Sequence, residues 1–231
     1  MTEHVEFFFD PVCPFCWVTS RWVRNVASQR PLDVEWRPLS LRLLNEPIGY
    51  ETRSPDYPHA HQRGLEMLRV VAAAREVHGA GVIGDLYTAM GEAVWNSAAP
   101  QEPTFEAVLA DTARGRDLNE ILNRVGLPAE LADAAHDESR DGTLRAETQE
   151  AVDRAGGGVG TPILSFSPPD GPAFFGPVID VPPDGEEALR LWDAVTTLGH
   201  WPGFAELKRG RRSFPRTPLS DRLAGQESRV G

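Results

Sequence analysis

The two cysteines of this chain stand close together, as Cys13-Pro14-Phe15-Cys16. A disulfide that stabilises a fold closes a long loop, whereas this pair closes almost none. In a chain without an export signal, such a pair is expected to carry out chemistry. Attack on a disulfide or another electrophile needs a thiolate, because the protonated thiol is a poor nucleophile. The spacing therefore indicates thiol–disulfide exchange.

The neighbouring residues give the two sulfurs different roles. Apolar residues at helical spacing follow Pro14, so we expect a helix to begin directly after Cys13. A helix N-terminus presents unpaired N–H groups and a partial positive charge, which favour the thiolate of Cys13. Cys16 lies one turn deeper on the same face and can resolve a mixed disulfide formed at Cys13. Phe15, between them, adds an apolar wall.

Two other interpretations of the cysteine pair remain open. A zinc site would need two further nitrogen or sulfur ligands, and His59 and His61 are the candidates. Alternatively, both thiols are buried and inert. We favour redox chemistry over both alternatives and assign no metal site.

A second feature lies far along the chain, at Thr161-Pro162. A proline at the start of a strand removes a ladder hydrogen bond, so its place before the apolar run Ile163–Phe166 needs another explanation. In a thioredoxin-type fold this peptide bond is cis and faces the cysteine pair, where the backbone of Thr161 can pair with an incoming thiol peptide. An ordinary trans proline is the alternative.

The elements that must position these residues follow a recognisable order. The pattern of apolar residues predicts, in sequence, a strand over 5–9, a helix from 14, a strand over 34–41, helices within 59–156, strands over Ile163–Phe166 and Ala173–Phe175 joined by a turn, and a helix over 186–198. This is the order of an α/β thioredoxin fold, βαβ and then ββα, with an all-helical insertion between the two halves.

The domain boundaries follow from that order. Residues 1–58 and 157–212 would form the thioredoxin-like domain, residues 59–156 the helical insertion, and residues 213–231 a loose C-terminal tail. Residues 42–58 are expected to be irregular and to link the two parts. Such linkers face clefts where ligands bind, so Asn45 and Tyr57 are candidate substrate contacts. Trp17 is a third candidate, with core packing as its alternative.

Composition argues against several other classes of protein. The 231 residues carry a net charge of -11, which disfavours nucleic-acid binding. No apolar run is long enough to span a membrane, and the first residues do not resemble a secretory signal, so we expect a cytoplasmic protein. Lys208 is the only lysine, which disfavours Schiff-base chemistry. The oligomeric state is left open.

The residues around the cysteine pair resemble a known family. The segment Asp10-Pro11-Val12-Cys13-Pro14-Phe15-Cys16-Trp17 is similar to actinobacterial DsbA-like proteins described as mycothiol-dependent nitroreductases. Further similar blocks are Thr19-Ser20-Arg21-Trp22, Leu44-Asn45-Glu46, His78-Gly79-Ala80, Tyr87-Thr88-Ala89-Met90-Gly91, Val159-Gly160-Thr161-Pro162, Phe174-Phe175-Gly176-Pro177 and Glu206-Leu207-Lys208-Arg209. The family usually has tryptophan where this chain has Phe15, which keeps an aromatic wall and loses an indole N–H donor.

This resemblance implies a cytosolic thioredoxin-fold enzyme that receives its electrons from mycothiol. No cofactor would be bound, and mycothiol would act as a thiol co-substrate. The implied partners are this small-molecule thiol and a small electrophilic or disulfide acceptor, including nitro-type compounds. Two alternatives are kept: a non-catalytic module that binds a small molecule or a partner, and a conjugating enzyme or isomerase similar to kappa-class glutathione transferases, which typically lack paired cysteines.

Overall fold

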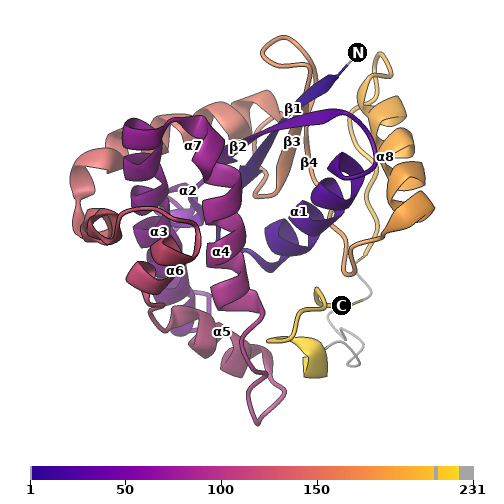
Figure 1. Ribbon diagram of the computed structural model, residues 1–231. Coiled ribbons are helices and arrows are strands. Elements are labelled where there is room, and N and C mark those ends of the chain that lie inside the picture. Colours follow the sequence, from indigo (N-terminus) through magenta and orange to yellow (C-terminus); the bar gives the residue numbers. More distant parts are fainter. Residues whose placement is uncertain (1, 211–212, 224–231) are drawn as a thin grey trace.

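A four-stranded sheet forms the centre of the protein, in a computed structural model that describes residues 2–210 and 213–223. The strand order is β2-β1-β3-β4 (Figure 1). β1 (Glu3–Phe9) and β2 (Leu32–Pro38) are parallel, whereas β3 (Ile163–Phe166) runs antiparallel to both β1 and β4 (Ala173–Phe175). The order and directions are those of a thioredoxin fold, which confirms the predicted fold class.

Helices cover both faces of this sheet and extend beyond its β2 edge. They are α1 (Pro14–Ala27), α2 (Leu41–Asn45), α3 (Asp56–His78), α4 (Ile83–Trp95), α5 (Phe105–Ala113), α6 (Leu118–Arg124), α7 (Asp141–Arg154) and α8 (Gly185–Gly199). α1 and α8 pack together on one face of the sheet, and α7 contacts β2 and β4. In Figure 1, α3, α4, α5 and α6 gather to the left of the sheet. All helices from α2 to α7 lie between the two halves of the thioredoxin fold in sequence.

The alternation of side chains along β1 divides the interior into two. Phe7 and Phe9 point into a large core with Trp22 of α1 and Trp192 of α8, whose rings are 5.3 Å apart. Phe8 points to the opposite face and joins a smaller cluster that includes residues of α7. All five rings are fully buried. Because β1 is buried on both faces of the sheet, its sequence ends in a continuous apolar run rather than an alternating pattern.

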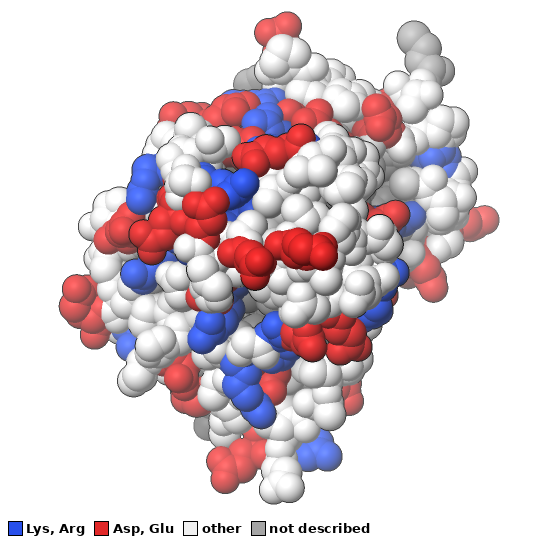
Figure 2. All heavy atoms as spheres, turned by 60° about the vertical axis from the view of Figure 1, so that its left-hand side comes forward, with Lys and Arg blue, Asp and Glu red and all other residues white. Residues whose placement is uncertain are grey.

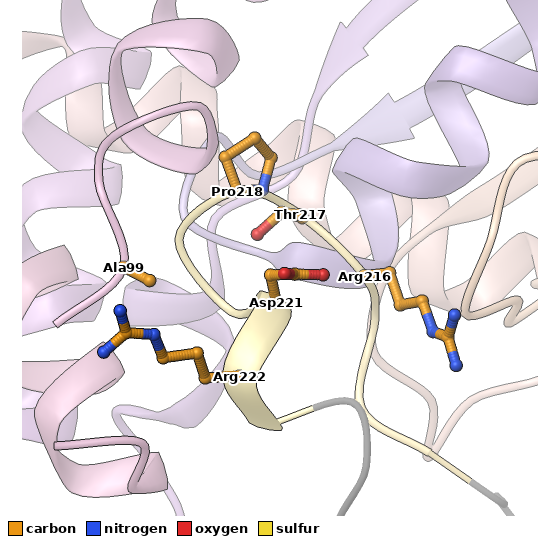
Figure 3. Close-up of a pocket in the computed structure, with 6 residues that line it drawn as sticks. All are labelled: Ala99, Arg216, Thr217, Pro218, Asp221 and Arg222. Carbon is orange, nitrogen blue, oxygen red and sulfur yellow. The ribbon is translucent and has the colours of Figure 1, made fainter. Parts of the chain in front are cut away.

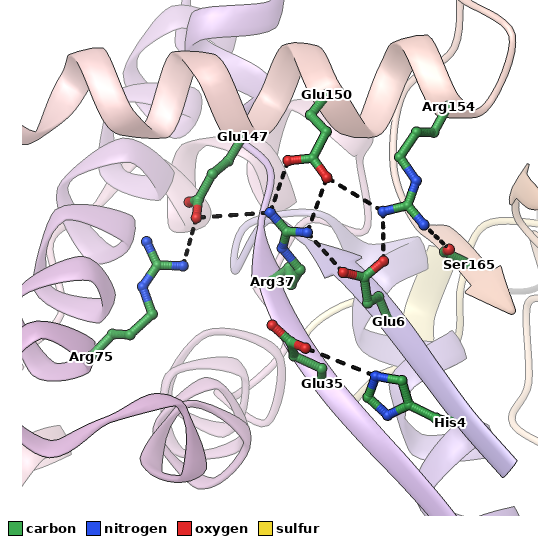
Figure 4. Close-up of polar contacts among 9 residues, drawn as sticks. All are labelled: His4, Glu6, Glu35, Arg37, Arg75, Glu147, Glu150, Arg154 and Ser165. Atoms are coloured by element: carbon green, nitrogen blue, oxygen red, sulfur yellow. Dashed lines mark hydrogen bonds and ion pairs between the residues drawn. The ribbon is translucent and has the colours of Figure 1, made fainter. Parts of the chain in front are cut away.

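A cluster of charged side chains fastens α7 to the sheet (Figure 4). Glu6 of β1 accepts hydrogen bonds from Arg37 of β2 at 2.7 Å and from Arg154 of α7 at 2.6 Å. Burial alone would raise the pKa of Glu6, but the two arginines outweigh it, and the pKa lies below its ordinary value. Arg37 also pairs with Glu150 of α7 at 3.0 Å. The charged form of Glu6 thus joins three elements.

The linker between β2 and the helical insertion is more regular than its composition predicts. Ser40 caps α2 because its hydroxyl accepts a hydrogen bond from the Leu43 N–H at 3.3 Å. α3 then begins at Asp56, so helices occupy both ends of the stretch 42–58, which was expected to be irregular. The five-residue helix α2 depends on its cap and on tertiary contacts. It is too short for the periodicity of apolar residues to predict it.

Residues 213–223, called the C-terminal segment below, pack on the core. Leu219 is fully buried and Leu223 is 7% exposed. The Leu219 N–H donates a hydrogen bond to the Trp95 carbonyl oxygen, at the end of α4, at 3.1 Å. The prediction of a loose tail is therefore wrong for this segment, because two apolar anchors outweigh its polar composition. The rest of the predicted tail, residues 224–231, lies outside the described residues.

The surface over the helical insertion carries charges of both signs. Figure 2 shows acidic and basic side chains interspersed on this face. Among the described residues, no helix combines the length and the apolar character that crossing a bilayer requires.

Candidate active site

Cys13 stands at the junction of β1 and α1. It is the N-cap residue of α1, with an extended backbone, and Pro14 takes the first helical position, where its missing N–H is not needed. The sulfur of Cys13 accepts a hydrogen bond from the Cys16 backbone N–H at 3.4 Å. A sulfur therefore occupies the place in which a serine or aspartate oxygen usually caps a helix, at the positive end of the helix dipole.

Thr161, which immediately precedes Pro162 and β3, contacts both sulfurs. The Thr161-Pro162 peptide bond is cis. The Thr161 carbonyl oxygen accepts a hydrogen bond from the Cys13 thiol at 3.6 Å, and its Oγ1 lies 2.9 Å from the sulfur of Cys16. Because the single hydroxyl proton of Thr161 is donated to the Phe8 carbonyl oxygen at 3.0 Å, the Cys16 thiol is the donor to Oγ1. The two motifs identified in the sequence thus meet in space.

The two thiols differ in their access to solvent. Both cysteines are free; the exposed fraction is 5% for Cys13 and zero for Cys16. Burial raises the pKa of Cys16 well above its ordinary value and the adjacent Cys13 adds to this effect, while the hydrogen-bonding groups of the Thr161 side chain and the Asp10 backbone, which can stabilise a thiolate, oppose it. A partner that enters from solvent therefore meets Cys13 first.

Asp10 is a fully buried carboxyl group at the end of β1, and the sequence alone predicts no role for it at the site. Its two oxygens accept hydrogen bonds from the N–H groups of Val12, at 3.0 Å, and Leu41, at 2.8 Å. Its carbonyl oxygen accepts from the Cys13 N–H at 3.0 Å. Burial raises the pKa of Asp10 to about 7, against the two hydrogen bonds that lower it. The sequence signal that could have identified Asp10 is its place three residues before Cys13.

Four aromatic side chains, called the aromatic row below, extend from the cysteine pair. The ring of Phe15 lies 6.2 Å from that of Phe214, Phe214 lies 5.9 Å from Phe105, and Phe105 lies 6.0 Å from Tyr57. These rings come from α1, the C-terminal segment, α5 and α3. The structure thus connects two predicted residues, Phe15 and Tyr57, through two that sequence reasoning missed. No spacing in the sequence relates Phe105 or Phe214 to the cysteines.

Comparison with known proteins identifies the family. Residues 12–209 match the family model Rv2466c-like, described as mycothiol-dependent nitroreductase Rv2466c. The chain belongs to this family. The Rv2466c-like assignment confirms the resemblance seen in the sequence, and this family and the thioredoxin fold make the protein a DsbA-like thiol oxidoreductase.

The individual proteins to which this Rv2466c-like chain is similar share only a minor part of its sequence. The uncharacterized protein Rv2286c of Mycobacterium tuberculosis is 32% identical over 227 residues, which are 97% of this chain and 87% of that protein. A probable DsbA oxidoreductase from Streptomyces coelicolor has 16% identity and a TM-score of 0.49, over 91% of this chain and 95% of its own. The cytosolic disulfide reductase DsbM from Pseudomonas aeruginosa has 18% identity and a TM-score of 0.47, over 84% and 99%.

Two of the candidate substrate contacts in this Rv2466c-like protein are engaged elsewhere. Trp17 is 5% exposed, and its ring packs edge-on against Tyr87, with Arg21 4.0 Å above it. It therefore serves core packing and offers little surface to a substrate. The Nδ2 group of Asn45 donates a hydrogen bond to the Leu41 carbonyl oxygen of its own helix at 2.7 Å. Asn45 is only partly exposed.

The histidines considered as zinc ligands do not join the cysteines. His59 is exposed, whereas His61 is buried with its Nδ1 2.9 Å from the Tyr50 hydroxyl. Burial, together with the nearby charges of Arg53 and Arg42, lowers the pKa of His61 to about 4. Within residues 2–210 and 213–223, no group of three or more His, Cys, Asp or Glu side chains is arranged to hold a metal ion. The zinc interpretation thus lacks a ligand set.

A hollow of about 610 Å³ lies beside the C-terminal segment. It opens to solvent and is lined by Ala99, Arg216, Thr217, Pro218, Asp221 and Arg222. Figure 3 shows the side chains of Arg216 and Arg222 extending to opposite sides, with Asp221 between them. Neither cysteine lines this hollow, so we do not assign the redox chemistry of this Rv2466c-like protein to it.

Proposed function

We propose that this protein is a reductase that uses Cys13 and Cys16 as a redox-active dithiol. One observation carries the proposal: Thr161 contacts both sulfurs where they lie at the N-terminus of α1. Membership of the Rv2466c-like family supports it. Cys13 is the attacking sulfur, Cys16 the resolving sulfur, and Pro14 and Phe15 hold and flank them.

Reduction of a disulfide acceptor, RSSR, takes two exchanges. The Cys13 thiolate attacks one acceptor sulfur, the acceptor S–S bond breaks, and RS⁻ leaves and takes up a proton. The Cys16 thiolate then attacks the sulfur of Cys13, forms the Cys13–Cys16 disulfide and expels the second RS⁻. Two electrons have then passed from the dithiol to the acceptor.

Thr161 assists the second exchange. Cys16 must lose its proton in spite of its burial, which raises its pKa. The Oγ1 of Thr161 lies 3.0 Å from the Phe8 carbonyl oxygen and 2.9 Å from the Cys16 sulfur. When Cys16 ionises, the hydroxyl proton can turn from Phe8 to the thiolate and stabilise it. Pro162 fixes the backbone that holds Thr161 in this place.

Mycothiol is the thiol that we propose restores the dithiol, on the strength of the family's description. Two mycothiol molecules reduce the Cys13–Cys16 disulfide and leave as mycothiol disulfide, which balances the cycle. The acceptors are small disulfides or nitro-type electrophiles; a nitro group takes two electrons and two protons to give a nitroso group and water. The 5% exposure of Cys13 favours small molecules over folded proteins.

Trapping the intermediate tests the roles of the two cysteines. We expect the Cys16→Ser variant, treated with mycothiol disulfide, to accumulate one mycothiol per chain at Cys13, as measured by intact mass and peptide mapping. Wild-type protein releases this adduct, and the Cys13→Ser variant forms none. An adduct that persists in wild type, or that maps to Cys16, would contradict the role assignment. No adduct in any form would favour the non-catalytic binding module.

A parallel measurement tests the thiol co-substrate. Oxidised wild-type protein is treated with mycothiol, glutathione or reduced thioredoxin, and the appearance of the free Cys13 and Cys16 thiols is followed over time. We expect mycothiol to react fastest. Equal rates for all three would remove mycothiol from the proposal without affecting the roles of the two cysteines.

A further inference from the structure

The C-terminal segment contacts both the thioredoxin half and the helical insertion (Figure 1). Near its start, the Arg216 N–H donates to the Asp180 carbonyl oxygen at 2.7 Å, and the Ser213 hydroxyl binds the Asp180 carboxylate. Asp180 follows β4 in the thioredoxin half. Farther along, the Leu219 N–H donates to Trp95 at the end of α4. The segment thus spans from the sheet side to the helical insertion.

Hydrogen bonds within the C-terminal segment hold it in one shape. The N–H of Thr217 donates to the Ser220 hydroxyl oxygen, and the N–H of Ser220 donates to the Thr217 hydroxyl oxygen, both at 3.1 Å. The Ser220 hydroxyl donates to the Pro215 carbonyl oxygen at 2.6 Å. Both hydroxyl-bearing residues are buried. These hydrogen bonds stabilise residues 215–220 as a compact turn.

Two contacts join this turn to the chain on either side of Cys13. The ring of Phe214 packs against Phe15, the second residue after Cys13. The indole N–H of Trp95, whose carbonyl oxygen holds the C-terminal segment, donates to the Pro11 carbonyl oxygen at 3.0 Å. Pro11 is the second residue before Cys13. The C-terminal segment therefore contacts the chain after Cys13 directly, at Phe15, and the chain before Cys13 through Trp95.

We propose that the C-terminal segment is a fixed wall of the acceptor site and that Phe214 sets the size of the molecule that reaches Cys13. Phe15, Phe214 and Phe105 carry no polar group in their rings, so this wall favours a compact apolar group on the acceptor beside the reacting atom. The family match ends at residue 209, so Phe214 lies outside that match, whereas Phe15 and Phe105 lie within it. The inference rests on Cys13 being the attacking thiol, as proposed above.

The test measures access to Cys13 and needs no turnover. In a Cys16→Ser background, Cys13 is alkylated with iodoacetamide or with a fluorescein maleimide, and both rates are followed by intact mass. We expect Phe214→Ala to raise the ratio of the bulky to the small rate about fivefold, because the smaller side chain hinders the bulky reagent less. Phe214→Trp should lower the ratio, and Phe214→Leu, which keeps apolar volume, should give an intermediate value.

Phe204→Ala is the matched control, because Phe204 also belongs to an aromatic pair, with Phe174 at 5.9 Å. Its ratio should equal that of the Cys16→Ser parent. An unchanged ratio in both Phe214→Ala and Phe214→Leu would overturn the proposal. The two proposals can also fail separately. If wild type reduces neither disulfide nor nitro-type acceptors but Phe214→Ala still raises the alkylation-rate ratio fivefold, the wall is retained and the proposed reductase activity is rejected.

Discussion

Thr161 links the two sulfurs to the sheet through three different contacts. Its carbonyl oxygen faces Cys13, its hydroxyl oxygen faces Cys16, and its hydroxyl proton goes to Phe8 of β1. The hydroxyl can hold the Cys16 thiol or stabilise its thiolate, depending on where its proton points. In the proposed mechanism, the Thr161 side chain therefore affects the step in which Cys16 ionises, whereas the Thr161 backbone affects Cys13.

Replacing Thr161 by valine removes the hydroxyl and keeps the shape of the side chain. We expect the second exchange to slow about tenfold, because a hydrogen bond to a charged group contributes about 1.5 kcal/mol, while the attack by Cys13 changes little. With a chromogenic disulfide, stopped-flow absorbance resolves the two successive releases of thiolate. Thr197→Val, on the exposed side of α8, is the control. Equal slowing of both phases would argue against the proton switch.

The effect of Asp10 on the free energy of unfolding should change with pH in the direction opposite to that of a carboxylate in an ion pair. Burial raises the pKa of Asp10 from its ordinary 3.8 to about 7. Between these values the folded protein holds a proton that the unfolded chain has lost, so this contribution to the free energy of unfolding is fully present below the unfolded pKa. It falls as pH rises and is lost above about 7. The whole change is about 4 kcal/mol.

The Asp10→Asn variant tests this sign. We expect the stability of wild type, relative to the variant, to decrease steadily from pH 4.5 to pH 7, as measured by urea unfolding at each pH, because asparagine binds no proton in this range. The exposed turn variant Asp170→Asn should show no such trend. A difference between wild type and Asp10→Asn that stays constant with pH would mean that Asp10 is charged throughout.

Between elements, glycines let the helical insertion approach the thioredoxin half. A Cβ atom on Gly91 of α4 would lie 2.2 Å from the ring of Trp17 in α1. A Cβ atom on Gly64 of α3 would lie 2.5 Å from an Asp10 carboxylate oxygen. Real side chains do not tolerate such contacts, so both helices rest directly on residues next to the cysteine pair. The position of the insertion is thereby coupled to that of α1.

Gly91→Ala should destabilise the protein, although alanine is the better helix former. The expected loss is about 1–3 kcal/mol, because the new methyl group displaces the buried Trp17 ring. Gly142→Ala in α7 is the matched control: its Cβ atom would have open space, so it should stabilise the protein by up to about 1 kcal/mol. Thermal unfolding of both variants measures the effects. If Gly91→Ala and Gly142→Ala changed the stability in the same direction, the close contact between α1 and α4 would be contradicted.

The elements that were predicted correctly share a local signal. The apolar runs Ile163–Phe166 and Ala173–Phe175 are bounded by prolines and a turn, and both strands occur with these limits. Pro14 marks the start of α1. α2 was missed because a five-residue helix has too few turns to show a period, and the cap at Ser40 is visible only once the fold is known. Local chemistry thus identifies the thioredoxin half better than its linker.

For the molecule as a whole, the C-terminal segment is part of the folded core. Its burial reflects contacts with α4 and the active-site loop, which lie far away in sequence. Separation in sequence also explains why some candidate site residues could be predicted from the sequence and others could not. Cys13 and Cys16 are recognised by their type and spacing, and Thr161 by its place before Pro162 and a strand. The position of Phe214 depends on how the whole chain packs, and no local pattern encodes it.

Leu219→Ala tests the integration of this segment. We expect a loss of about 2–4 kcal/mol in the free energy of unfolding, since Leu219 is fully buried and its removal leaves a cavity. Leu207→Ala is the control, because Leu207 is 81% exposed. Urea denaturation with a single transition measures both variants. Equal and small effects would mean that the C-terminal segment folds independently of the core.

The chain departs from the sheet at the end of β2 and rejoins it at the start of β3, and β1 alone lies between these strands. Pro38 pairs with Phe9, and Ile163 with its neighbour Phe8. The exit and the return therefore lie only about 10 Å apart, two strand spacings. The chain between these two points therefore begins and ends near the two cysteines. Because its two ends are so close, this stretch of chain can change in length without disturbing the strand pairing, and such a change would alter the surroundings of the two sulfurs while the sheet that holds them stays the same.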